Sequence, residues 1–374
     1  MRLTCERSAL LKALSVTSRI VERRNTIPIL SNALLTADGK RLTLRATNLD
    51  LEASTACAAE VAEPGTTTVP AQMLRDIVGK LPEGATVSLD DTDGNGRIML
   101  KAGRSRFQIG TLPAGDFPDL QAGEMSHRFA WPVADVLRMV TETSFAISSE
   151  ETRYYLNGVY LHAWPDGDHH NGLRTVATDG HKLSRLTLPR PEGAEGMPGI
   201  ILPRKLVEEL KKVVTTDGAA FFQVAVSTSK IRLERDDLVL TSKLIDGTFP
   251  DYQRVIPTEN GNRLTLARAD FASALDRVKT VSGGRGRAVK LDITEAGVTL
   301  SQHNPDSGDA TDEVDGELDG KPLSIGFNGD YLAEILTVLD ADAIEIALGD
   351  PGSPTILTRK NSDDLTIVLM PMRV

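Results

Sequence analysis

The feature that most constrains the fold of this chain is a threefold sequence repeat with a period of roughly 130 residues. In each copy a short alternating strand pattern runs into an amphipathic helix pattern, and the copies align without gaps over residues 3–14, 129–140 and 264–275. A second helix pattern follows in each copy, over residues 71–80, 203–214 and 329–339. Two-layer α+β domains can share such patterns by chance, but three matching registers favour a true triplication. The sequence therefore predicts three topologically similar α+β domains, each with two helices and antiparallel sheets.

The chain length supports this division, because one hydrophobic core stops growing at about 250–300 residues and this chain has 374. Gly, Pro and polar residues interrupt the periodic pattern at residues 122–128 and 256–263. These interruptions predict domains at residues 1–125, 126–258 and 259–374.

The composition indicates a cytoplasmic protein. Its two cysteines, Cys5 and Cys57, lie in apolar strand-like segments, which favours reduced thiols over a disulfide framework. The N-terminal segment lacks the apolar core of a signal peptide, and no apolar run reaches the roughly 20 residues of a membrane helix. We therefore expect no membrane association.

The net charge of -10 argues at first sight against a nucleic-acid partner, since phosphate binding usually requires a basic surface. The charge is unevenly distributed, however. The six predicted helices, of which the first in each copy is expected over residues 8–24, 133–146 and 268–281, together carry a net positive charge. This distribution suits a protein that accepts DNA along its helices, although ordinary surface charge can give the same pattern.

Sequence patterns typical of metal binding or catalysis are incomplete in this chain. Residues 90–102 resemble a calcium loop, but Ala102 stands where a bidentate Glu is required, so a hairpin turn is the better interpretation. Residues 316–322 have the wrong glycine spacing for a phosphate loop. His169 and His170 lie in a predicted loop with no further ligand at a suitable spacing. We therefore predict no metal, no cofactor and no catalytic residue.

Four segments are more distinctive than the repeats, namely RYYLNGVYL from Arg153, TVATDGHKL from Thr175, FPDYQRV from Phe249 and the C-terminal VLMPMRV. Together they resemble the bacterial DNA polymerase III beta-subunit family, the replicative sliding clamps. The resemblance extends from LLKAL near the N-terminus to the last residue. It implies a head-to-tail homodimer that forms a six-domain ring, with helices around the hole and sheets on the outside. Such a ring encircles duplex DNA and slides on it without reading the sequence.

The resemblance also implies the partners. A processivity factor of this kind tethers the DNA polymerase III alpha subunit, the clamp loader complex, and other polymerases and repair factors that carry clamp-binding peptides. The peptides would enter a largely apolar pocket between the second and third domains. Residues that match the family's pocket are Leu156, Thr178, Gly180, His181, Lys182, Leu183, Pro250, Arg254, Val255, Asn328, Tyr331, Val368, Met370, Pro371, Met372 and Arg373.

Two further surfaces are implied by the resemblance and by the charge pattern. Candidate DNA-binding residues are Lys12, Arg24, Arg75, Tyr154, Tyr155, Arg204, Lys205, Lys211 and Lys212. Candidate dimer-interface residues are Arg104, Arg106, Phe107 and Ile109 in the first domain and Thr280, Val281, Asp309, Asp312 and Glu313 in the third. Opposite charges on the two ends suit a head-to-tail contact.

Some positions depart from the family's usual pattern. Lys182 stands where Arg is frequent, which would weaken a bidentate contact. Gly352 and Pro354 occupy a loop that is usually more apolar, and Thr280 is less apolar than its usual counterpart. We therefore expect a somewhat weaker dimer than in other members, and the sequence leaves the peptide preference open.

The residues leave two other classes of function open. One is a hydrolase or metal-dependent enzyme that uses His169, His170 or His181, and the missing ligand spacing counts against it. The other is a repeat-built scaffold that binds peptides and has no role on DNA. It shares the pocket with a clamp but not the ring.

Overall fold

The computed structural model describes residues 1–22, 25–121, 123–164, 172–214, 219–282, 288–306 and 308–373. The chain forms two compact units. The first comprises residues 1–134, 191–197 and 212–244, and the second comprises residues 135–190, 198–211 and 245–374. The middle repeat therefore contributes to both units.

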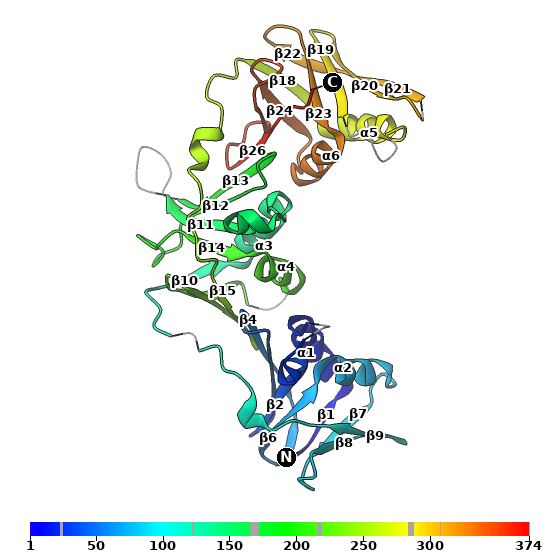
Figure 1. Ribbon diagram of the computed structural model, residues 1–374, viewed down its shortest axis with the longest axis vertical. Coiled ribbons are helices and arrows are strands. Elements are labelled where there is room, and N and C mark those ends of the chain that lie inside the picture. The colour runs from blue at the N-terminus through cyan, green and yellow to red at the C-terminus, as the bar shows by residue number, and fades with distance from the viewer. Residues whose placement is uncertain are drawn as a thin grey trace. The chain divides into compact units, whose positions relative to one another are not determined.

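The first unit contains a five-stranded and an eight-stranded sheet (Figure 1). The five-stranded sheet has the order β5(Glu60–Glu63), β1(Arg2–Glu6), β7(Thr86–Asp90), β8(Arg97–Ala102) and β9(Ser105–Gly110). The eight-stranded sheet has the order β10(His127–Pro132), β15(Phe221–Val226), β16(Lys230–Arg235), β17(Leu238–Lys243), β4(Leu51–Ala58), β3(Arg41–Thr47), β2(Asn32–Asp38) and β6(Gly65–Pro70). Strands β4 and β17 come from different repeats and pair antiparallel, so one sheet continues from the first repeat into the second.

Two helices of the first unit pack side by side, α1(Arg7–Ile20) and α2(Ala71–Lys80). Helix α1 begins where Glu6 accepts a hydrogen bond from the backbone N–H of Ala9 at 2.9 Å, as an N-cap does. The helix ends at Ile20, before the predicted residue 24. Leu10 and Leu14 of α1 and Leu74 of α2 are fully buried in the core of the first repeat, as the repeat pattern predicts.

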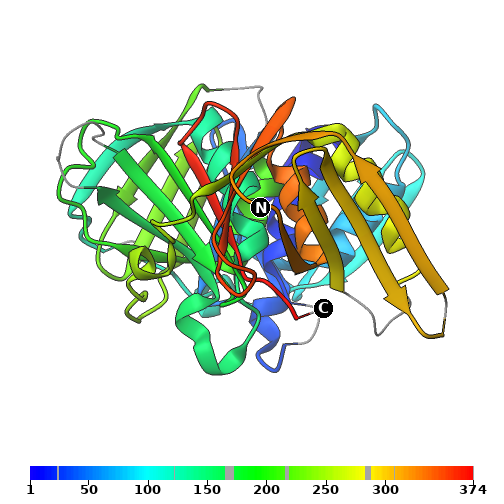
Figure 2. The same cartoon turned by 90° about the horizontal axis from the view of Figure 1, so that it is seen from above.

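The second unit contains a nine-stranded and a four-stranded sheet. The nine-stranded sheet has the order β14(Ile200–Pro203), β11(Gly158–Trp164), β12(Gly172–Thr178), β13(Lys182–Pro189), β26(Leu365–Leu369), β25(Thr355–Arg359), β24(Ala343–Leu348), β18(Asn262–Ala267) and β22(Gly316–Asp319). The four-stranded sheet has the order β21(Gly308–Val314), β20(Gly297–Asn304), β19(Ala288–Thr294) and β23(Leu323–Asn328). Figure 2 shows the red strand β26 beside the green strands of the middle repeat, and β13 and β26 are the pair that joins the second repeat to the third.

The remaining helices follow the predicted pattern. They are α3(Val133–Thr143), α4(Arg204–Val213), α5(Arg268–Lys279) and α6(Gly329–Val338). Short 3₁₀ helices occur as η1(Pro28–Ser31), η2(Ala114–Asp116), η3(Ser144–Ala146), η4(Glu151–Leu156) and η5(Tyr252–Val255). Among the described residues each repeat thus has two α-helices, each preceded by a strand, and the expected α+β architecture is confirmed.

Candidate functional site

An apolar cluster lies on one face of the nine-stranded sheet, where the second and third repeats meet. Leu183 on β13 lies directly opposite Val368 on β26, and both are almost fully buried. Leu156, at the end of η4, packs into the same cluster, so three of the predicted apolar pocket residues are brought together. The cluster also contains Val176, Ile201, Phe249 and Tyr252, which are not among the predicted pocket residues.

The C-terminal tail is fixed to this region by its backbone. The N–H of Met370 donates to the carbonyl of His181 at 2.9 Å, and the N–H of Met372 donates to the carbonyl of Gly326 at 2.8 Å. Pro371 lies between them and has no N–H to offer. Met370 and Met372 are each 40% exposed. The fixed backbone therefore holds two flexible apolar side chains that can adjust to different ligands.

The turn from Thr178 to Lys182 is built by side-chain hydrogen bonds. The hydroxyl of Thr178 donates to the carbonyl of Lys182 at 2.8 Å, and Asp179 accepts from the N–H groups of His181 and Lys182. Gly180 has a φ of +90°, and a Cβ there would lie 2.8 Å from the guanidinium of Arg153. The turn therefore requires glycine, and it places the exposed His181 beside the sheet.

Lys182 links the turn to helix α6. Its side chain is 6% exposed, its ammonium lies 2.8 Å from Glu334, and it stands 4.1 Å from the centre of the Tyr331 ring. His181 stacks on the same ring at 6.3 Å. Asn328 caps α6 by accepting from the N–H of Asp330 at 2.9 Å, so its side chain has a structural role already.

The segment around η5 supplies exposed groups next to the cluster. Val255 is 52% exposed and Pro250 is exposed. Arg254 projects into solvent and pairs with Asp251 at 3.0 Å. Tyr252 of the same short helix is buried and anchors the segment, which leaves Val255 and Arg254 accessible to a ligand.

The predicted DNA-facing residues differ in their surroundings. Lys12 on α1, Arg75 on α2 and both Lys211 and Lys212 on α4 are exposed. Tyr154 is 53% exposed and packs edge-on against Tyr155 with ring centres 5.8 Å apart.

Two further basic residues lie at the start of α4. Arg204 donates to the carbonyl oxygens of Ile147 and Ser148, which occupies its guanidinium within the protein. Lys205 is half-buried. Arg24 lies outside the described residues.

Comparison with known proteins identifies the family. Residues 1–121 match the N-terminal domain, residues 131–251 the central domain and residues 253–373 the C-terminal domain of the DNA polymerase III beta subunit. The beta sliding clamp of Caulobacter vibrioides is 46% identical over 374 residues, and that of Escherichia coli is 35% identical over 377, each alignment covering 100% of both chains. A solved sliding clamp from Bartonella birtlesii, bound to griselimycin, superposes with a TM-score of 0.96 at 44% identity over 100% of both chains.

This chain belongs to the DNA polymerase III beta-subunit family. Beta sliding clamps are processivity factors and not enzymes, so the alternative of a hydrolase or metal-dependent enzyme is excluded, and so is a scaffold with no role in replication. His169 and His170 lie outside the described residues. Within the described ranges no three His, Cys, Asp or Glu side chains are grouped to hold a metal ion, and no helix is long and apolar enough to cross a membrane.

Most of the predicted interface residues of this clamp subunit lie on or next to two sheet edges. Strand β9 is an edge of the five-stranded sheet, with Arg104 and Arg106 exposed around it and Phe107 half-buried. Ile109 on the same strand is 2% exposed and belongs to the core of the first repeat, so its side chain supports the strand from inside.

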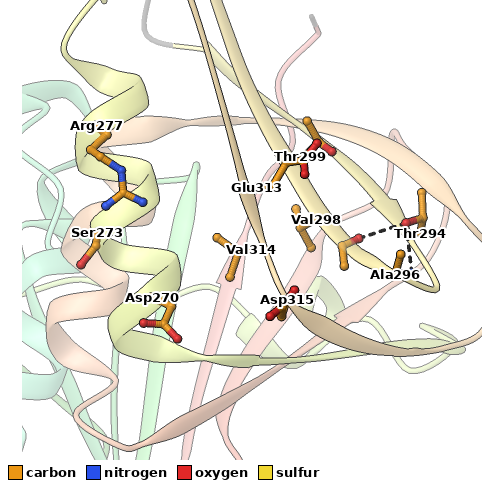
Figure 3. Close-up of a pocket in the computed structure, with 11 residues that line it drawn as sticks. Asp270, Ser273, Arg277, Thr294, Ala296, Val298, Thr299, Glu313, Val314 and Asp315 are labelled. Carbon is orange, nitrogen blue, oxygen red and sulfur yellow. Dashed lines mark hydrogen bonds between the residues drawn. The ribbon is translucent and has the colours of Figure 1, made fainter.

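The other edge is β21 of the four-stranded sheet. A cavity of about 630 Å³ lies between α5 and strands β20 and β21 (Figure 3), and Glu313 lines it. Asp312 pairs with Arg277 of α5 at 2.6 Å, and this contact lowers the pKa of Asp312. Asp309 hydrogen-bonds His303, and Thr280 and Val281 follow the end of α5 with at least part of each residue accessible.

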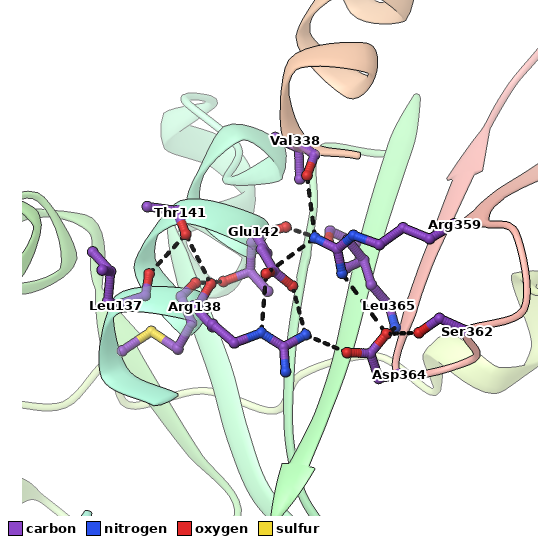
Figure 4. Close-up of polar contacts among 12 residues, drawn as sticks. Leu137, Arg138, Thr141, Glu142, Val338, Arg359, Ser362, Asp364 and Leu365 are labelled. Carbon is purple, nitrogen blue, oxygen red and sulfur yellow. Dashed lines mark hydrogen bonds and ion pairs between the residues drawn. The ribbon is translucent and has the colours of Figure 1, made fainter. Parts of the chain in front are cut away.

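A polar network that the sequence analysis missed supports the sheet from its other side (Figure 4). Arg138 of α3 donates to Glu142 at 3.0 Å and also to Asp364, just before β26. Arg359 of β25 reaches Glu142 at 3.1 Å and Asp364 at 3.7 Å. Arg138 and Glu142 are four residues apart on α3, but no local pattern predicts their contacts with Arg359 and Asp364, because these form only when the second and third repeats share a sheet.

Proposed function

We propose that the apolar cluster and the C-terminal tail form the pocket by which this clamp binds its partners. The observation that supports the proposal is the combination of a buried platform, Leu183 and Val368, with exposed Val255, Met370 and Met372 on the segments next to it. Exposed apolar side chains fixed by a rigid backbone favour binding of an apolar peptide. The occupants would be peptides of the polymerase III alpha subunit, the clamp loader, and other polymerases and repair factors.

Binding of a fluorescein-labelled peptide that carries the clamp-binding segment of the cell's own polymerase III alpha subunit tests the pocket. We expect full-length protein to bind it and a variant that lacks residues 370–374 to lose at least about tenfold in affinity while keeping its native mass. Equal affinity of the two proteins would show that the pocket is elsewhere.

We further propose that two copies close head to tail, β9 of one against β21 of the other, into a ring of three domains per chain. The three domains would comprise residues 1–125, 126–258 and 259–374. We also propose that the protein acts in the cytoplasm. Two open sheet edges of opposite charge, Arg104 and Arg106 against Asp309 and Glu313, support this arrangement. Lys12, Arg75, Lys211 and Lys212 would contact phosphates through screened, mobile interactions.

Retention on circular DNA tests the ring. Labelled protein is loaded on nicked circles with its clamp loader and ATP, and the circles are then cut at one site. We expect loss of protein on linearisation, since a ring slides off free ends. Equal retention on both forms would mean ordinary phosphate binding and would contradict the proposal.

A further inference from the structure

Two arginines lie on the same sheet face as the apolar cluster, immediately next to it. Arg174 is on β12 and Arg185 is on β13. Arg185 lies opposite Val176 on one side and Thr366 on the other, whereas Leu183, two residues away, lies opposite Val368. Because residues two apart on a strand point to the same face, the arginines continue the surface that Leu183 and Val368 begin.

Neutral groups hold the Arg174 side chain in place. Its guanidinium carbon lies 3.4 Å from the centre of the Trp164 ring, a stacked cation–π contact. Its Nε donates to the hydroxyl of Thr187 at 3.3 Å, and its Nη1 donates to the hydroxyl of Tyr252 at 3.4 Å. Tyr252 also shares a hydrogen bond of 3.1 Å with His162. The guanidinium is therefore oriented without being neutralised.

The Arg185 side chain is likewise held by a neutral group. Its Nη2 donates to the hydroxyl of Thr366 at 2.7 Å, while its buried Nε has no hydrogen-bond partner. Burial lowers the pKa of Arg185, the charge of Arg174 lowers it further, and Asp363 opposes both from a distance longer than an ion pair. Neither arginine forms an ion pair with any carboxylate in the part of the chain that the structure describes.

Two adjacent guanidinium groups without a counter-ion are unfavourable in a half-buried site, and an anion would relieve this. Guanidinium groups bind planar oxyanions such as carboxylate in a bidentate manner. Tyr252 connects the arginines to the apolar cluster, because its ring packs in that cluster and its hydroxyl accepts from Arg174. A peptide bound over the cluster would therefore lie close to the two charges.

We propose that Arg174 and Arg185 form a carboxylate-binding subsite, which receives an Asp or Glu side chain flanking the apolar part of a bound peptide. The inference rests on the proposed peptide pocket and specifies its chemistry: this clamp prefers partners whose apolar motif is followed or preceded by an acidic residue. The arginines bind and orient the partner and take no part in the apolar contact itself.

The test is a selection from a displayed peptide library with an apolar core and randomised flanking positions, using the full-length protein. We expect Asp or Glu to be enriched at one flank with the wild type. The R174Q/R185Q variant is expected to select the same core without that enrichment, and to bind the enriched peptide about five- to tenfold more weakly. The R174K/R185K variant keeps the positive charges but loses the planar guanidinium groups that bind a carboxylate with two hydrogen bonds. It should bind the enriched peptide with intermediate affinity.

Several outcomes would overturn the inference. Acidic enrichment that persists in R174Q/R185Q, or absence of enrichment with the wild type, would refute the subsite but leave the pocket standing. If the wild type selects no apolar peptide sequence at all, both the pocket and the subsite are refuted. Melting temperatures identify any variant that fails to fold, in which case the Lys variant decides.

Discussion

Leu183 and Val368 lie directly opposite each other on β13 and β26, although one belongs to the middle repeat and the other to the end of the chain. Both side chains are nearly fully buried. Because these two strands pair, the apolar platform lies on one continuous sheet and is not a gap between two separate domains. The exposed groups on the tail and on η5 are held relative to the same sheet.

The M370A/M372A variant should weaken peptide binding more than it lowers stability. Each residue is 40% exposed, so truncation removes only part of its apolar contact within the free protein, whereas each methylene covered by a peptide contributes about 0.8 kcal/mol. We expect affinity to fall by about tenfold or more in fluorescence anisotropy, with a melting temperature only slightly below that of the wild type. The matched control is I27A, which removes another exposed apolar side chain and should bind normally. A large drop in melting temperature would show that the methionines are core residues.

Truncation of Lys182 should loosen the junction between β13 and α6. The K182A variant loses the contact with Glu334 and the stacking on Tyr331, at a buried position, and we expect a loss of about 1–3 kcal/mol. Hydrogen exchange should rise in residues 329–338 before it rises in the other helices. K101A, an exposed lysine on β8, serves as the control. Unchanged exchange in α6 would show that the ion pair contributes nothing to this junction.

The stability supplied by Asp364 should disappear in acid. Burial opposes ionisation of this carboxyl, but hydrogen bonds from Ser362 and Arg138 and the charges of Arg138 and Arg359 hold its pKa below the ordinary 3.8. A carboxyl whose pKa is lower in the folded state contributes stability that is present above its unfolded pKa and is lost as the pH falls through the folded value.

The D364N variant measures that contribution. Wild type should be more stable than D364N at neutral pH in urea unfolding, and the difference should shrink only below about pH 4. A difference that stays constant down to about pH 3 would mean that Asp364 acts through packing and not through its charge.

Charge reversal on the β9 edge should open the ring. Arg104 and Arg106 are exposed on the edge proposed to face Asp309 and Glu313 of the second copy. The R104E/R106E variant should raise the dimer dissociation constant by at least about tenfold, measured by sedimentation, because like charges then face each other. K101E reverses a charge on the neighbouring strand β8 and should leave the dimer intact. A dimer that is insensitive to R104E/R106E would place the interface elsewhere.

Local pattern was sufficient for much of this fold. The spacing of Leu10, Leu14 and Leu74 and of their counterparts predicts the six α-helices and the three repeats, because helix and strand periodicity depend on neighbours within a few residues. The motifs around Thr178 and the C-terminal tail identify the family by resemblance, and periodicity alone would not have done so.

Only the tertiary structure decided what depends on contacts between distant segments. It paired β4 with β17 and β13 with β26, so that the compact units cut across the middle repeat. It turned Asn328 into a helix cap, buried Ile109, and assembled Arg138, Glu142, Arg359 and Asp364 into one network. The physical reason is that strand register and ion pairing are fixed by packing across the sheet, and residues far apart in sequence carry no local signal of it.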